Sequence, residues 1–160
     1  MENQIVVATK NEVTTTKQSD LYVSFWIEEE LFGINIIDIK EVTQLLDITP
    51  IFHAPSEVKG YVNLRGEIHM ILDFRHMMGL VDKEPAEKAR IIIFKTSVGE
   101  PFGILVDHIG EVVSVTADQI EPRSPSDTLN TNREDLISGV CKLDGKLMIM
   151  VNCSNLLNRG

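Results

Sequence analysis

The stretch GYVNLRGEIHMILDFR at residues 60–75 decides the fold, because GVCKLDGKLMIMVNCS at residues 139–154 repeats its pattern. Both stretches have a Gly, a Leu four residues later, a second Gly, and then a run of Ile, Leu and Met. A charged residue and a Gly between two apolar runs indicate a β-hairpin in each copy. The tips differ in charge, since Arg65 in the first copy stands where the later copy has Asp144.

A second pair of segments extends this repeat. PFGILVDHIGEV (101–112) aligns without a gap on LFGINIIDIKEV (31–42). Each is preceded by a segment rich in β-branched and aromatic residues, LYVSFWI (21–27) and ARIIIF (89–94), which predicts a strand. The sequence therefore predicts two copies of one β-rich unit of roughly 60–70 residues, a length typical of small domains.

Many short strands, hairpin turns and few helices predict a mainly β protein of small barrels or a sandwich. A unit of this size buries little surface alone, so we expect the two units to pack around a shared apolar seam. The composition divides the chain into four expected segments. They are a polar, Thr-rich flexible tail at 1–20, a first unit at 21–80, a charged connector at 81–89, and a second unit at 90–157. Exchange of terminal elements between the units is left open.

The composition excludes several classes of function. The formal net charge is −9 and the pI is near 4.9, which disfavours binding to nucleic acid or to an anionic membrane but suits a basic protein partner. No segment has the eighteen or so consecutive apolar residues of a membrane span. Cys141 and Cys153 lie in apolar runs and are expected to be buried, reduced thiols, as in a cytoplasmic protein.

No motif for catalysis, metal binding or cofactor binding is found. His69 lies in an apolar strand and is expected to be packed rather than to bind a ligand. A binding module is therefore the preferred class, with no cofactor and no metal. A β-barrel hydrolase that pairs His69 or His108 with Asp73 or Asp107 stays open as the rival from another class, and a nucleic-acid-binding barrel is disfavoured by the charge.

The repeat separates positions that serve the fold from positions free to serve a partner. Positions shared by both copies are assigned to the fold, and they are Gly33 with Gly103, Gly60 with Gly139, Leu64 with Leu143, and Gly66 with Gly145. Arg65 differs from its counterpart, and its guanidinium suits carboxylates and carbonyls of a partner. Asn63 adds an amide at the same tip. An arginine that is merely solvated at a turn remains the alternative.

The segments VKGYVNLRGEIHMILDFRHMMG, FGINIIDIKEV, FGILVDHIGEV and LDGKLMIMVN, in their order along the chain, resemble the landmarks of the chemotaxis coupling protein family, CheW. The resemblance covers about residues 20–157. One departure is Met70, where the family usually has Pro. The resemblance implies two five-stranded SH3-like β-barrels around a shared hydrophobic core, with short helices.

The resemblance also implies a function. The protein would be a cytoplasmic adaptor without catalysis that couples the signalling tip of transmembrane, methyl-accepting chemoreceptors to a CheA-type histidine kinase through its regulatory domain, within membrane-associated arrays. Matching motifs assign receptor binding to Ile39, Glu41, Gly60, Asn63, Arg65 and Val112. Kinase binding is assigned to Val23, Ile36 and Ile39. A scaffold for a pathway other than motility is the alternative within the family, and the chain is expected to be a complete stand-alone protein.

Overall fold

The computed structural model describes residues 18–123 and 134–157 as a mainly β protein with two sheets. Its strands are β1 Ser19–Ile27, β2 Glu30–Asn35, β3 Ile39–Gln44, β4 Val58–Leu64, β5 Glu67–Asp73, β6 Arg90–Phe94, β7 Phe102–Val106, β8 His108–Thr116, β9 Ile120–Pro122, β10 Ile137–Leu143 and β11 Lys146–Val151. The short helices are α1 Phe74–Met77 and the 3-10 turns η1 Ile36–Asp38, η2 Ala117–Gln119, η3 Glu134–Leu136 and η4 Cys153–Asn155.

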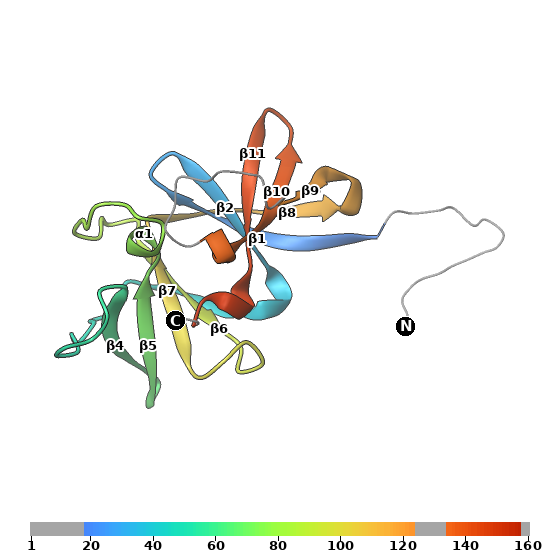
Figure 1. Cartoon of the computed structure of the whole chain (residues 1–160). Coiled ribbons are helices and arrows are strands. Elements are labelled where there is room, and N and C mark those ends of the chain that lie inside the picture. Colours follow the sequence, from blue (N-terminus) through green and yellow to red (C-terminus); the bar gives the residue numbers. More distant parts are fainter. Residues whose placement is uncertain (1–17, 124–133, 158–160) are drawn as a thin grey trace.

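The two copies of the repeat exchange their first strands. The six-stranded sheet has the order β8-β1-β2-β11-β10-β9, so β1 and β2 of the first copy join the later strands of the second. The five-stranded sheet has the order β3-β6-β7-β5-β4, so β6 and β7 of the second copy join the first. Figure 1 shows the two sheets as separate halves, with β4 to β7 in the lower half.

The sheets therefore cut across the bounds expected at 21–80 and 90–157. Residues 81–89 are a loop that leads from α1 into β6, and β6 pairs with β3 and β7. This loop connects two strands of the same sheet rather than two sheets. β1 begins at Ser19, two residues inside the expected tail at 1–20, and residues 1–17 of that tail lie outside the described residues.

Strand pairing repeats with the sequence. β5 runs parallel to β7, with Met70 opposite Phe102, and β11 runs parallel to β2, with Ile149 opposite Phe32. These four residues are counterparts in the two aligned repeats. Both hairpins predicted from the repeats form, across Arg65-Gly66 and across Asp144-Gly145. The duplication in sequence is thus a duplication in three dimensions.

Gly60 and Gly139, which are shared by the two copies, are needed for the same structural reason. A Cβ atom on Gly60 would collide with the carbonyl oxygen of Thr49, whose backbone bonds to Tyr61. A Cβ atom on Gly139 would lie 2.6 Å from the carbonyl oxygen of Glu121 on β9. A neighbouring backbone crosses close to each hairpin strand, which a side chain would prevent.

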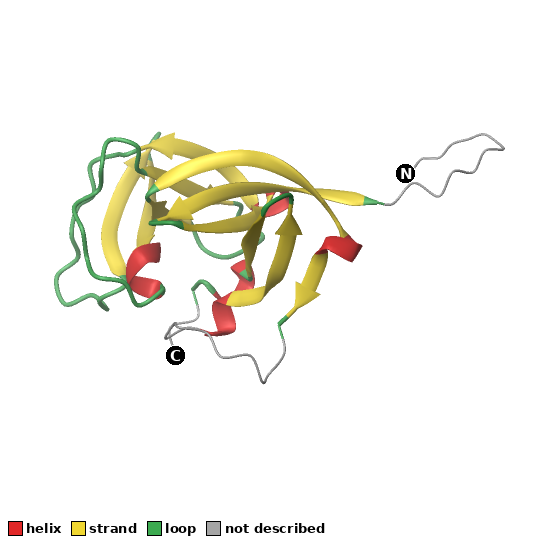
Figure 2. Cartoon of the chain, turned by 90° about the horizontal axis from the view of Figure 1, so that it is seen from above, coloured by secondary structure: helices red, strands yellow, loops and turns green. Residues whose placement is uncertain are grey.

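A single hydrophobic core joins the two sheets. It contains Phe25, Phe32 and Ile34 from the six-stranded sheet, and Phe94 and Ile104 from the five-stranded sheet. Smaller clusters lie within each sheet alone, around Ile91 in one and around Met148 in the other. The expectation of two small β units around a shared core is confirmed, and Figure 2 shows the curved strands that enclose it.

Both cysteines are buried, as expected. None of the helices in residues 18–123 and 134–157 is both long and apolar enough to cross a membrane.

Candidate docking surface at the Arg65 hairpin tip

Arg65 is held at the β4–β5 hairpin tip in a backbone conformation that its residue type disfavours. Its φ is 51° and that of Gly66 is 88°, the signs of a type I′ turn. A residue with a Cβ atom in this left-handed region costs roughly 1–2 kcal/mol. The Asn63 side chain supports the turn, because its Oδ1 accepts a hydrogen bond from the Gly66 N–H at 2.8 Å.

The guanidinium of Arg65 reaches the other edge of the five-stranded sheet. Its Nη2 forms an ion pair with Oε2 of Glu41 on β3, and 66% of the Arg65 side chain remains exposed. A second ion pair, 3.8 Å between Lys40 Nζ and Glu67 Oε1, joins the same strands. A guanidinium has five N–H donors, so the contact with Glu41 leaves donors that face solvent.

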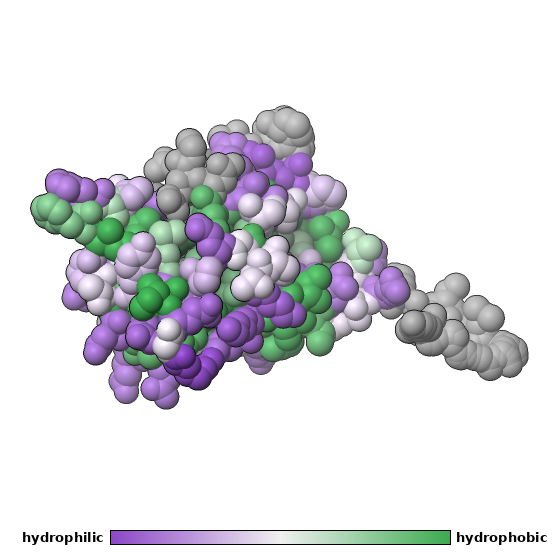
Figure 3. Space-filling view, turned by 90° about the horizontal axis from the view of Figure 1, so that it is seen from below, coloured by the Kyte–Doolittle hydropathy of each residue, from purple (hydrophilic) through white to green (hydrophobic). Residues whose placement is uncertain are grey.

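Apolar side chains flank this tip on the outer face of β4 and β5. Asn63 lies opposite Ile68, which is 53% exposed, and Tyr61, two residues before Asn63 on the same face, is 43% exposed. We call Glu41, Tyr61, Asn63, Arg65 and Ile68 the tip surface. Figure 3 shows hydrophobic side chains in small patches between hydrophilic ones on the face seen from below. The tip surface combines charge, an amide and apolar area, as protein-binding sites do.

The other residues expected to bind receptor or kinase are not part of the tip surface, and Gly60 is next to Tyr61 on β4. Val112 is on β8 of the other sheet, 54% exposed, where it pairs with Val23 of β1. Val23 and Ile39 are 7% and 8% exposed and belong to the shared core. Ile36, on η1, is 37% exposed. The structure therefore brings Glu41, Asn63 and Arg65 together and leaves Val112 on another face.

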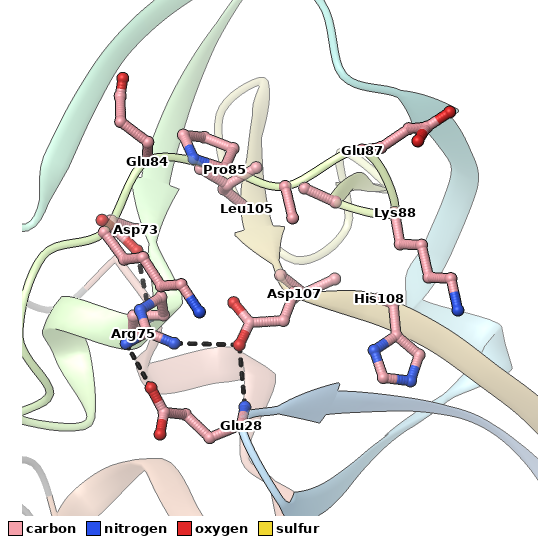
Figure 4. A pocket seen from close by; sticks show the side chains of 14 residues that line it. Glu28, Asp73, Arg75, Glu84, Pro85, Glu87, Lys88, Leu105, Asp107 and His108 are labelled. Atoms are coloured by element: carbon pink, nitrogen blue, oxygen red, sulfur yellow. Dashed lines mark hydrogen bonds and ion pairs between the residues drawn. The ribbon is translucent and has the colours of Figure 1, made fainter.

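A second polar cluster surrounds Arg75, a buried arginine on α1 (Figure 4). Its Nη1 lies 2.9 Å from Oδ2 of Asp107 and its Nη2 lies 2.5 Å from Oε2 of Glu28. Nε and Nη2 also donate to the carbonyl oxygen of Val81 at 3.3 and 3.1 Å. These contacts join α1, the β1–β2 turn, the β7–β8 junction and the loop at 81–89.

Charge and burial shift the pKa values of two acids beside Arg75, Glu28 and Asp73, in opposite directions. The hydrogen bond and the charge of Arg75 lower the pKa of Glu28. Burial raises the pKa of Asp73, although the charge of Lys59, 3.9 Å away, opposes this. Asp73 Oδ1 also accepts from the Arg75 backbone N–H at 3.1 Å, which caps α1.

The cluster lines a cavity of about 380 Å³, the Arg75 cavity, which also contains His108. No Ser, Thr or Cys is among the described residues that line it. His108 stacks on Trp26, and Asp107 is engaged by Arg75. His69 is buried beside Glu67. The described lining of the cavity thus offers no hydroxyl or thiol nucleophile, and no group of three or more His, Cys, Asp or Glu in the described part of the chain could hold a metal.

A family model, CheW-like domain, matches residues 21–160. The chain belongs to the CheW-like domain family. Chemotaxis protein CheW of Rhizobium meliloti strain 1021 is 28% identical over 129 residues, 81% of each chain. Chemotaxis protein CheW of Thermotoga maritima is 29% identical over 135 residues, 84% of this chain and 85% of the relative.

A solved structure is similar as well. Scaffolding protein TtCheW from Thermoanaerobacter tengcongensis superposes with a TM-score of 0.76 at 31% identity, over 84% of this chain and 90% of that one. The resemblance read from the sequence motifs is therefore confirmed at the level of family and fold.

Sequence reasoning missed three residues that stand out in this CheW-like domain. Tyr61 and Ile68 could have been found, because alternation along β4 and β5 places them on the same outer face as Asn63. Arg75 could have been found by the comparison that singled out Arg65, since its counterpart in the second copy is Ser154. The partners of Arg75 are distant in sequence, and no local pattern predicts them.

Proposed function

We propose that this chain is a non-enzymatic chemotaxis adaptor that couples transmembrane chemoreceptors to a cytoplasmic histidine kinase through the regulatory domain of the kinase. It works in the cytoplasm, within receptor arrays at the membrane. Membership of the CheW-like domain family supports the adaptor role, and the names of the relatives, chemotaxis proteins and a scaffolding protein, agree with it.

The observation that carries the proposal is the backbone of Arg65. The chain keeps an arginine at φ 51° and aims its largely exposed guanidinium outward, although the second copy has an ordinary Asp-Gly tip. A residue that costs stability where it sits is expected to serve binding. The receptor tip is proposed to contact Arg65 and Asn63, with Tyr61 and Ile68 as its apolar surroundings and Val112 as a separate contact on β8.

Glu41, Ile39 and Gly60 have positioning roles in this proposal. Glu41 holds the guanidinium of Arg65, Ile39 begins β3 and packs in the core, and Gly60 allows Thr49 to pair with β4. Ile36 is the exposed member of the three residues assigned to the kinase, so the kinase is proposed to dock near η1, with Val23 and Ile39 shaping that surface from below.

An adaptor changes which kinase state is populated by binding one state better than the other. Contacts of micromolar affinity, about −8 kcal/mol each, suffice when many copies act together in an array. The test mixes the chain with a receptor signalling fragment and a histidine kinase, and it measures ternary complex formation and kinase autophosphorylation. We expect Arg65→Glu to weaken receptor binding at least about tenfold, about 1.4 kcal/mol, and to leave kinase binding unchanged. Absence of a complex between the wild-type chain and either partner would overturn the proposal.

A further inference from the structure

The Arg75 cavity has a counterpart at the end of the second copy. This Asp38 cavity has a volume of about 480 Å³ and is lined by residues of β1, β2, η1, the β6–β7 loop, β10, β11 and η4. The two repeat alignments relate part of the two linings. Asp73, Arg75, Leu105 and His108 of the first correspond to Asn152, Ser154, Asn35 and Asp38 of the second.

The two cavities share their backbone design. Asp73 caps α1 by accepting from the Arg75 N–H at 3.1 Å, and Asn152 caps η4 by accepting from the Ser154 N–H at 3.2 Å. They differ in what fills them. The first holds a guanidinium that neutralises Glu28 and Asp107, whereas the second has the short hydroxyl of Ser154 at the same place.

The Asp38 cavity keeps a negative charge without a built-in cation. Among the described residues that line this cavity, Asp38 is the one with a charged side chain. No Lys or Arg of the described residues forms an ion pair with Asp38. Its neighbours are neutral. Burial and the Asp38 carboxylate raise the pKa of the Cys153 thiol, and burial, with the charge of Asp20, raises the pKa of the Tyr22 hydroxyl. A half-buried carboxylate in polar surroundings attracts a cation that can also donate hydrogen bonds.

Two exposed isoleucines border this carboxylate. Ile36 and Ile37, the residues before Asp38 on η1, are 37% and 64% exposed. Apolar area beside a recessed carboxylate matches a protein segment that carries an arginine among apolar residues, since arginine combines a planar donor fork with an apolar stem.

We propose that the Asp38 cavity is a binding site for an arginine side chain of a protein partner, whose guanidinium pairs with Asp38 as Arg75 pairs with Glu28 and Asp107 in the first copy. Ile36 and Ile37 contact the apolar residues beside that arginine. Ile36 lies on the surface that is proposed to bind the kinase. A kinase that docks there would therefore have to present an arginine, and to this extent the inference rests on the proposed function.

The test uses the full chain labelled with ¹⁵N and titrates it with N-acetyl-arginine amide, followed by backbone amide shifts. N-acetyl-citrulline amide, which has the same shape without the charge, is the matched ligand. We expect the arginine probe to shift the amides of Asp38, Val98 and Asn152 to Ser154 in a saturable way, and the citrulline probe to shift them at least about fivefold less. Asp38→Asn should abolish the response, while Asp144→Asn, at the second hairpin tip, should retain it.

Equal responses to both probes, an undiminished response in Asp38→Asn with its wild-type spectrum otherwise retained, or shifts spread over other surface carboxylates would each overturn the inference. The titration needs neither receptor nor kinase. Its failure would therefore leave the adaptor proposal standing, and failure of the ternary complex would not alter the titration.

Discussion

The two hairpin tips of the repeat have the same length and the same trailing glycine, yet their backbones differ. Arg65 has a φ of 51°, whereas Asp144 is not among the residues with positive φ, and only Gly145 of that tip has one, 77°. Asp-Gly tolerates positive φ at both positions, but the second tip uses it only at the glycine. The less suitable residue type occupies the more demanding turn, and this supports the proposal that Arg65 serves binding.

The ends of the two copies differ in the same way. The first copy closes with a buried arginine joined to two carboxylates, and the second closes with a serine beside an open polar cavity. In both comparisons the strands and turns align in sequence, and the side chains at matching positions differ in charge. The shared positions build the fold, and we propose that the unshared side chains stabilise one end or bind a partner.

The largest effect is expected when the Arg75 network is removed. Arg75→Met leaves Asp107 and Glu28 without their cation, and we expect the free energy of unfolding to fall by about 3 kcal/mol. The loss is no larger because both acids are partly solvated. Ser154→Ala, the counterpart change, should cost about 0.5 kcal/mol or less. Denaturant unfolding of both variants measures the difference. Similar costs for the two would show that the ends of the copies do not differ as described.

A smaller effect with the opposite sign is expected at the tip. Arg65→Asn places a residue that tolerates positive φ before Gly66, and we expect it to raise the free energy of unfolding by about 1 kcal/mol. Loss of the exposed Arg65–Glu41 pair should subtract only a few tenths of this, about 0.5 kcal/mol at most. Asp144→Asn, without a positive φ to relieve, is the control and should change little. A gain at Asp144 but not at Arg65 would contradict the comparison.

How far the sequence predicts this fold depends on how local each signal is. Strands β1, β2 and β4 to β7 and both hairpins follow from apolar runs and Gly-containing turns, because these signals lie within a few residues. Which strands pair across the two copies is a long-range choice that no periodicity encodes, so the exchange of β1, β2, β6 and β7 was left open.

The residues of the candidate site also differ in how far the sequence predicts them. Motif matching selected Glu41, Asn63 and Arg65, which the structure brings together. It also selected Val23 and Ile39, which are buried, because a motif marks positions that matter without showing whether they face the core or solvent. Arg75 was missed since its partners, Glu28 and Asp107, are distant in sequence.

The smallest effect expected on stability is a change in its pH dependence. Because Arg75 lowers the pKa of Glu28 in the folded chain, the stabilisation from Glu28 is present above its unfolded pKa of about 4.3 and is lost as the pH falls through the lower folded value. Glu28→Gln should therefore lose melting temperature less steeply than the wild type between about pH 5 and pH 3.

Asp73 contributes to the same window with the opposite sign. Burial raises the pKa of Asp73 in the folded chain, so protonation of Asp73 stabilises the fold as the pH falls. This contribution is the same in the wild type and in Glu28→Gln, so it does not affect the comparison. The neighbouring Glu29→Gln serves as control and should keep the wild-type slope. Melting curves collected across this range check the prediction, and a steeper slope in Glu28→Gln would contradict it.

The most direct test of the central claim, that the unlike side chains of a repeated frame perform the binding, reverses the charge at each tip in turn. Affinity for a receptor signalling fragment is measured by calorimetry for wild type, Arg65→Glu and Asp144→Arg, with melting temperatures to confirm folding. We predict a loss of at least about tenfold, about 1.4 kcal/mol, for Arg65→Glu and no change for Asp144→Arg. Equal losses at both tips, or a loss only in Asp144→Arg, would contradict the account.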